Sequence, residues 1–313
     1  MSRNESAQQL NRPLGAKTGG FSYTAAAVAY VIVSFMASII ISLCGAEYGS
    51  DAYIYISYIA AQIGILLAVI VTMRFDNVHF RQAFPVKCHP KYFIIGALII
   101  FGLMFSLSWV NTWFISLFEN LGYVPRESTS YYPTLSGGLI VPALLVIAVL
   151  PAICEEALFR GVLFNSVNRS IGSIPAIFIV GFCFSLFHGS PEQTVYQFIA
   201  GCLFAFIAMR SGSILPSVMM HFLNNGVIII LAAAGCFDAA GDLIISSTGN
   251  IILMAVSAAC LVAGVLWLCL DRHKNKVKIH EGSSKETARF FMWGAVGIVI
   301  MLVVWFCVLF GVA

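Results

Sequence analysis

Nine mostly apolar stretches constrain this chain more than any other feature of its sequence. A helix that crosses a bilayer needs about 20 apolar residues, and it must satisfy its own backbone hydrogen bonds. The chain is 60% hydrophobic and only 10% charged, whereas a soluble domain carries about 25% charged residues. We therefore predict an all-α polytopic membrane protein with about nine transmembrane helices, at residues 24–46, 53–73, 93–117, 139–168, 174–188, 193–210, 213–234, 250–270 and 291–312.

The basic residues indicate how these helices are oriented. Cytosolic loops of membrane proteins carry an excess of Lys and Arg. If the N-terminus is cytosolic, sixteen of the 17 basic residues fall in cytosolic loops or at the cytosolic ends of spans, and only Arg126 falls outside. The short basic N-terminus and the lack of a transit peptide favour an integral, multi-pass protein of a bacterial plasma membrane.

The middle of the chain differs from the spans on either side of it. The stretch 139–168 is longer than a bilayer requires, and Pro151 lies deep enough in it to bend the helix. The stretch 174–188 is short. We therefore expect a packed central unit, with segments bounded at 1–23 (cytosolic tail), 24–138 (membrane helices), 139–234 (central core) and 235–313 (membrane helices).

Glu155, Glu156 and Arg160 form the first polar cluster inside an apolar stretch. A charge at bilayer depth costs at least about 2.5–3.5 kcal/mol, so it persists where it pairs, faces a cavity or does chemistry. Glu156 and Arg160 are four residues apart and can pair on one helix face, whereas Glu155 points about 100° away and has no obvious partner in its helix. A purely structural ion pair would account for Glu156 and Arg160 but not for Glu155.

Two further polar groups lie on later stretches, namely His188 near the end of 174–188 and His221 with Asn225 on 213–234. A histidine at a helix end is more often a capping residue, and two polar residues four apart are often interhelical packing contacts. Counted from the predicted cytosolic ends of their helices at 1.5 Å per residue, Glu155, His188 and Asn225 lie roughly 18–21 Å deep and His221 roughly 12 Å deep. After modest tilt of the helices, these groups can reach a similar level and converge on one site.

The three motifs, in this order on successive membrane segments, resemble those of the CPBP family of CAAX prenyl endopeptidases and bacteriocin-processing proteases, also called Abi. They are Glu-Glu-xxx-Arg at 155–160, Phe-xxx-His at 184–188 and His-xxx-Asn at 221–225. The resemblance covers about residues 139–234 and implies an all-helical intramembrane endopeptidase. It implies that Glu155 and His188 activate water, that His221 and Asn225 hold the oxyanion, and that Glu156 and Arg160 fix the helix geometry.

A metal is possible but not favoured. If zinc or another divalent ion binds, Glu155, His188 and His221 would hold it, with one position left for water. The soluble zinc-protease signature His-Glu-xx-His is absent from the sequence, and an asparagine is a better oxyanion donor than zinc ligand. We therefore expect no cofactor, and we expect membrane lipid and a protein or peptide substrate as partners, with no nucleic acid.

Two other function classes remain open at this stage. The first is a non-catalytic family member that acts as a membrane scaffold or immunity factor, which would have no need of an unpaired Glu155. The second is a proton or ion pathway, since buried Glu and His residues also relay protons. No inverted repeat is visible in the sequence, which disfavours a transporter.

Overall fold

The computed structural model describes residues 14–125, 132–238, 242–272 and 281–311. Every apolar stretch within these ranges is helical, and the described residues contain no β-strand, only an isolated bridge between Phe237 and Leu243. The predicted all-α class is confirmed. Parts of the expected tail (1–13) and of the last basic loop (273–280) lie outside the described residues.

Within the described residues, the first half of the chain contributes five helices, and the second half contributes a segmented central rod and five further helices. The rod starts at Ile140, the first residue of α7. The elements are α2 (Ala16–Leu43), α3 (Asp51–Phe75), α4 (Phe80–Ala83), α5 (Lys91–Ser106), α6 (Ser108–Glu119), η2 (Gly137–Leu139), α7 (Ile140–Ala143), η3 (Leu144–Val149), α8 (Leu150–Glu156), η4 (Ala157–Phe164), α9 (Asn165–Ser170), α10 (Ser173–Phe187), α11 (Thr194–Ser211), α12 (Leu215–Ala233), α13 (Ser247–Leu270) and α14 (Ser284–Leu309).

In the part of the chain that the structure describes, seven helices are long and apolar enough to cross a membrane, or eight if α5 and α6 form one bent span. The predicted polytopic character is therefore confirmed. The count of nine and the orientation stay predictions, because α10 is only 15 residues long. The first helix starts at Ala16, within the segment 1–23 that the sequence analysis assigned to a tail.

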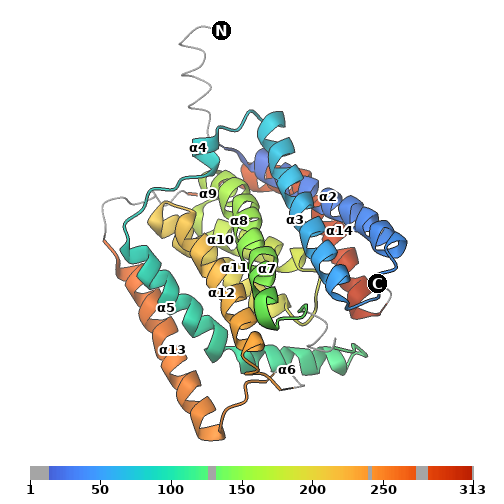
Figure 1. Ribbon diagram of the computed structural model, residues 1–313. Coiled ribbons are helices and arrows are strands. Elements are labelled where there is room, and N and C mark those ends of the chain that lie inside the picture. The colour runs from blue at the N-terminus through green and yellow to red at the C-terminus, as the bar shows by residue number, and fades with distance from the viewer. Residues whose placement is uncertain (1–13, 126–131, 239–241, 273–280, 312–313) are drawn as a thin grey trace.

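Helix α6 changes the interpretation of the third predicted span, 93–117. The helix axis bends by 44° between α5 and α6. In Figure 1, α6 lies across the lower end of the bundle. Its Trp109 and Trp113 side chains are 60% and 59% exposed, and indole rings prefer the membrane–water interface. The sequence 108–119 thus fits the edge of a membrane better than its centre.

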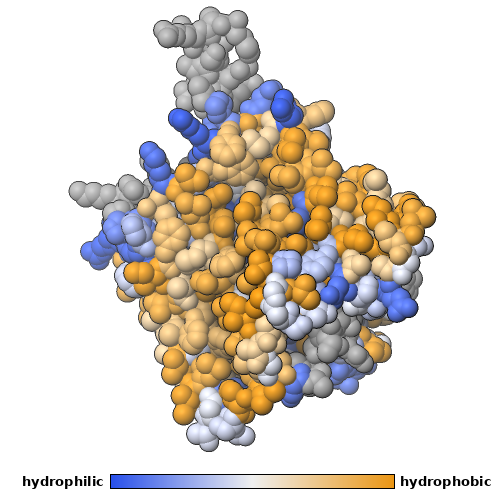
Figure 2. Space-filling view, in the orientation of Figure 1, coloured by the Kyte–Doolittle hydropathy of each residue, from blue (hydrophilic) through white to orange (hydrophobic). Residues whose placement is uncertain are grey.

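The rod of α7, η3, α8, η4 and α9 forms the centre of the molecule (Figure 1). All residues of 158–164 are buried, and α2, α3, α10 and α11 pack against η4 while α12 packs against α8. Helices α2, α13 and α14 instead expose many large apolar side chains, such as Phe35, Leu270 and Met292. Figure 2 shows this apolar surface as a broad orange area. A surface of this kind is suited to lipid.

Candidate active site

Glu155 and Glu156 are the last two residues of α8, between two π-helical stretches of the rod, η3 and η4. The π-helix is rare, and its wider turns are frequent at functional sites because they redirect side chains. Both glutamates are buried, with exposed fractions of 9% and 0%. Adjacent residues on a helix point in different directions, so the two carboxylates meet different neighbours.

Glu156 lies in a network of charged groups that engages its Oε1 atom, while its Oε2 atom has no hydrogen bond among the described residues. The Arg160 guanidinium donates to Glu156 Oε1 at 2.7 Å, which confirms the predicted ion pair, and His221 Nδ1 lies 3.0 Å from the same oxygen. A carboxylate beside a guanidinium is ionised and can only accept, so His221 Nδ1 carries a hydrogen and donates it. His221 Nε2 therefore faces the other way, and it lies 3.9 Å from Glu155 Oε2.

Arg160 is fully buried, and its remaining contacts explain how the protein tolerates it there. A second guanidinium nitrogen donates to the Gly201 carbonyl oxygen at 3.0 Å. The guanidinium also lies 4.5 Å from the centre of the Phe184 ring, a favourable cation–π contact. Only glycine fits at position 201, because an added Cβ would lie 2.9 Å from Gly181 Cα of α10. The close contact of α10 and α11 thus positions an acceptor for Arg160.

Glu155 has a partner that the sequence analysis did not find. Gln62 Nε2, from α3, donates to Glu155 Oε1 at 3.1 Å, and Gln62 is only 4% exposed. Within the described residues, Glu155 Oε2 and Gln62 Oε1 are buried and have no hydrogen bond. Both oxygens can accept a hydrogen bond but cannot donate one to each other. A signal existed, since Gln62 is the only amide side chain in the apolar stretch 53–73.

His188 follows directly after α10 and faces the same region. Its Nδ1 lies 2.9 Å from the Phe184 carbonyl oxygen. A carbonyl oxygen only accepts, so Nδ1 carries the hydrogen and Nε2 has a free lone pair. His188 interacts electrostatically with Glu155 and His221, although no hydrogen bond joins it to either of them among the described residues.

Asn225 lies one turn after His221 on α12, and its amide donates to the Ile147 carbonyl oxygen at 3.0 Å. Pro151, four residues after Ile147, has no N–H to offer to that carbonyl, so α12 supplies the missing donor. Asn225 Oδ1 accepts from Asn224 Nδ2 at 3.0 Å. One amide hydrogen of Asn225 remains for another acceptor.

The donor set does not fit a zinc ion as it is arranged. Zinc binds nitrogen and oxygen at about 2.1 Å in a tetrahedron, which would bring the two ligand atoms to about 3.4 Å from each other. His221 Nε2 and Glu155 Oε2 are 3.9 Å apart. Within the described part of the chain, no three His, Cys, Asp or Glu side chains are close enough to hold a metal. We derive no catalytic step through a metal.

Residues 137–227 match a family described as type II CAAX prenyl endopeptidase, Rce1-like. This segment, less than a third of the chain, is similar to that family and is called the Rce1-like core. The predicted resemblance to CPBP intramembrane proteases is confirmed over this segment, and the match supports a CAAX-type intramembrane endopeptidase in general terms. No curated protein and no solved structure matches the chain. The Rce1-like core contains all six candidate residues, whereas Gln62 lies outside it.

Proposed function

We propose that this chain is an intramembrane endopeptidase that cleaves a membrane-associated, CAAX-type protein with a water activated by Glu155 and His188. One observation carries the proposal: Glu156 is paired with the Arg160 cation and with His221, while its buried neighbour Glu155 receives its only hydrogen bond, among the described residues, from the neutral amide of Gln62. A buried carboxylate that no cation pairs with carries a desolvation cost, which a purely structural residue has no reason to impose. The Rce1-like match supports the same class of reaction.

In the first step, a water donates one hydrogen to Glu155 Oε2 and the other to His188 Nε2. Neither atom takes part in a hydrogen bond among the described residues. Glu155 removes the first proton as the water oxygen attacks the carbonyl carbon of the substrate. General-base assistance of this kind contributes typically about 100- to 10,000-fold to a rate.

In the second step, the carbonyl oxygen becomes an alkoxide that needs hydrogen-bond donors. His221 can donate at Nε2 only as an imidazolium, because its Nδ1 hydrogen is already given to Glu156. Glu155 is neutral at this stage, so Glu156, Arg160, the His221 imidazolium and the alkoxide sum to zero charge, which suits a buried site. The second amide hydrogen of Asn225 completes the pair of donors.

In the last step, the C–N bond breaks and the proton held by Glu155 passes to the leaving amine. The second proton of the water leaves the new carboxylic acid through His188 Nε2 and also passes to the amine, so the products are a carboxylate and an ammonium group, and Glu155 and His188 return to their starting states. Gln62 acts as a positioning residue here, since its donation to Glu155 Oε1 leaves Oε2 directed at the water.

The test is a cleavage assay with purified protein in liposomes. The peptides are a prenylated peptide that ends in a CAAX motif, the same peptide without the lipid, and a bacteriocin-type leader. We expect cleavage of the prenylated peptide, with rates at least about 100-fold lower in Glu155→Gln and His188→Ala. Glu119→Gln is the matched control, because Glu119 is exposed on α6.

Each outcome of this assay distinguishes one alternative. A wild-type protein that cleaves none of the peptides would favour the non-catalytic scaffold or immunity factor. Wild-type rates in Glu155→Gln would eliminate the water activation proposed above. Activity that a strong chelator removes and zinc restores would establish a metal-dependent mechanism, whereas we expect activity to survive the chelator.

A further inference from the structure

A small cavity lies at the end of the bundle where α4, α9 and the turn from α11 to α12 meet. Its volume is about 120 Å³. Arg160, which pairs with Glu156, forms the wall of the cavity nearest to the candidate active site. Asn168 and Arg169, on the far wall, follow Glu155 by 13 or more residues and so lie on the order of 20 Å from it along the rod. The cavity therefore adjoins the candidate active site at Arg160 and extends away from it.

Hydrogen bonds hold the walls of the cavity in place. Asn165 Nδ2 donates to the carbonyl oxygens of Ala83 and Gly161 at 3.1 and 2.9 Å, which ties the α4 segment to the rod. The backbone N–H of Ile214 donates to the Pro85 carbonyl oxygen at 2.9 Å, which ties the same segment to the start of α12. The cavity is thus formed before any ligand binds.

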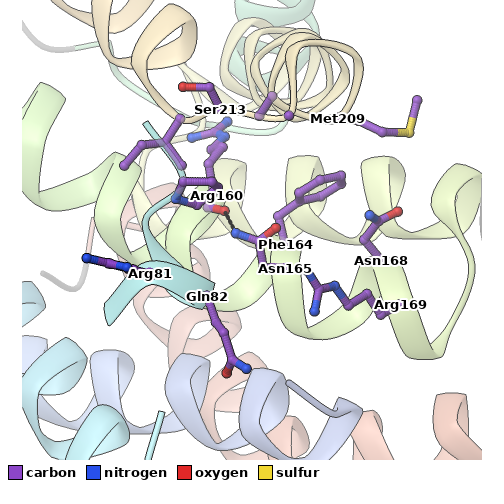
Figure 3. A pocket seen from close by; sticks show the side chains of 13 residues that line it. Arg81, Gln82, Arg160, Phe164, Asn165, Asn168, Arg169, Met209 and Ser213 are labelled. Atoms are coloured by element: carbon purple, nitrogen blue, oxygen red, sulfur yellow. Dashed lines mark hydrogen bonds between the residues drawn. The ribbon is translucent and has the colours of Figure 1, made fainter. Parts of the chain in front are cut away.

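Three arginines line the cavity, and none of the described residues that line it is acidic. In Figure 3, Arg81 and Arg169 lie on opposite sides of the view, with Arg160 between them. Glu156 neutralises Arg160. Within the described residues, no salt bridge joins Arg81 or Arg169 to a carboxylate, and both side chains are exposed. Two positive charges therefore remain for a ligand.

Asn168 adds a second requirement. It lines the cavity and is only 3% exposed, and its Oδ1 has no hydrogen-bond partner among the described residues. This oxygen needs a donor. A fitting ligand must therefore carry anionic oxygens for the arginines and a hydroxyl or amine for Asn168.

We propose that this cavity binds the glycerophosphate headgroup of an anionic phospholipid. The phosphate oxygens accept from Arg81 and Arg169, whose planar guanidinium groups match phosphate geometry, and a glycerol hydroxyl donates to Asn168 Oδ1. Basic pockets between membrane helices are suited to such headgroups, and this one lies at the ends of the helices, at the depth where headgroups lie.

The carboxylate of a CAAX-type substrate is the other anion to consider. It lies three residues beyond the scissile bond, and three extended residues span about 10 Å. Asn168 and Arg169, which would hold the headgroup, lie on the order of 20 Å from Glu155 along the rod. The substrate carboxylate would therefore fall short, which favours the lipid.

The test measures binding and needs no catalytic activity. Purified full-length protein in neutral detergent is titrated with phosphatidylglycerol, phosphatidylcholine, soluble glycerol 3-phosphate and a CAAX-type peptide, and the shift of the melting temperature is recorded. We expect saturable stabilisation by phosphatidylglycerol and none by phosphatidylcholine. In Arg81→Gln/Arg169→Gln, we expect the apparent affinity to fall at least about tenfold.

Arg74→Gln/Arg272→Gln is the matched control, because it removes the same charge from two exposed arginines outside the cavity. Asn168→Asp is a second test, since it places a negative charge against the phosphate. Stabilisation by both phosphatidylglycerol and glycerol 3-phosphate would support a phosphate site, and stabilisation by the lipid alone would show that the acyl chains are also needed. Equal losses in the cavity and control variants, or an arginine-dependent shift with the peptide alone, would overturn the proposal.

Discussion

Glu155 and Glu156 are consecutive residues of one helix, yet the protein treats them in opposite ways. Glu156 is fully buried and shares one oxygen between Arg160 at 2.7 Å and His221 at 3.0 Å. Glu155 has one neutral donor, Gln62, and no guanidinium or ammonium partner among the described residues, although each glutamate keeps one oxygen without a hydrogen bond there. The difference teaches that burial alone does not distinguish a structural carboxylate from a reactive one. The partners that surround each carboxylate decide its role.

Glu155→Gln should produce the largest effect on activity. The amide cannot take a proton from water, so we expect the cleavage rate to fall about 100- to 10,000-fold while the melting temperature in detergent changes little. The two measurements must be made on the same preparation. A large fall in melting temperature would show that the two glutamates do not differ in the way described above.

Glu156→Gln should produce the largest effect on stability. It leaves the buried Arg160 without its carboxylate, and breaking a buried ion pair costs about 3–5 kcal/mol. Unfolding in mixed micelles, followed by circular dichroism, measures this loss. Combining it with Arg160→Met should recover part of the lost stability, because no buried charge is then left unpaired. A stable but inactive Glu156→Gln would mean that the roles of the two glutamates are exchanged.

Gln62→Leu should have a smaller effect, confined to the chemical step. Glu155 loses the donor that orients it, so we expect kcat to fall about tenfold, as for one lost hydrogen bond of about 1.4 kcal/mol, with KM unchanged. Gln62→Asn, which keeps a shorter amide, should retain intermediate activity. Gln197→Leu on α11 is the matched control. A change in KM alone would argue for substrate contact rather than positioning.

Pro151→Ala should produce the smallest effect and sharpens the role of Asn225. The new N–H competes for the Ile147 carbonyl oxygen that Asn225 now satisfies. In a double-mutant cycle on stability, the cost of Asn225→Ala should shrink by about 0.5–1.5 kcal/mol in the Pro151→Ala background. Costs that add without any coupling would show that the proline does not determine this hydrogen bond.

Local spacing made several features predictable from the sequence. The apolar stretches mark the helices, because a membrane-spanning segment requires about 20 apolar residues. The Glu156–Arg160 pair follows from a separation of four residues on one helix. The order of motifs on 155–160, 184–188 and 221–225 indicated the Rce1-like core that the comparison identifies at 137–227.

Contacts between segments far apart in the chain could not be predicted from local spacing. Gln62 and Glu155 are 93 residues apart, and only the packing of α3 against the rod brings them together. The hydrogen bond from His221 to Glu156 depends equally on how α12 packs against α8. The bend before α6 was missed because 93–117 reads as one continuous apolar stretch.

Phe184 shows why an aromatic residue belongs four positions before His188. Its ring centre lies 4.7 Å from that of His188 and 5.9 Å from that of His221, and its face contacts the Arg160 guanidinium. The rigid ring of Phe184 thus packs against both histidines and stabilises the Arg160 cation. A leucine at this position would remove both the cation–π contact with Arg160 and the ring contacts with the two histidines. A substitution of Phe184 therefore changes both properties of the site at once.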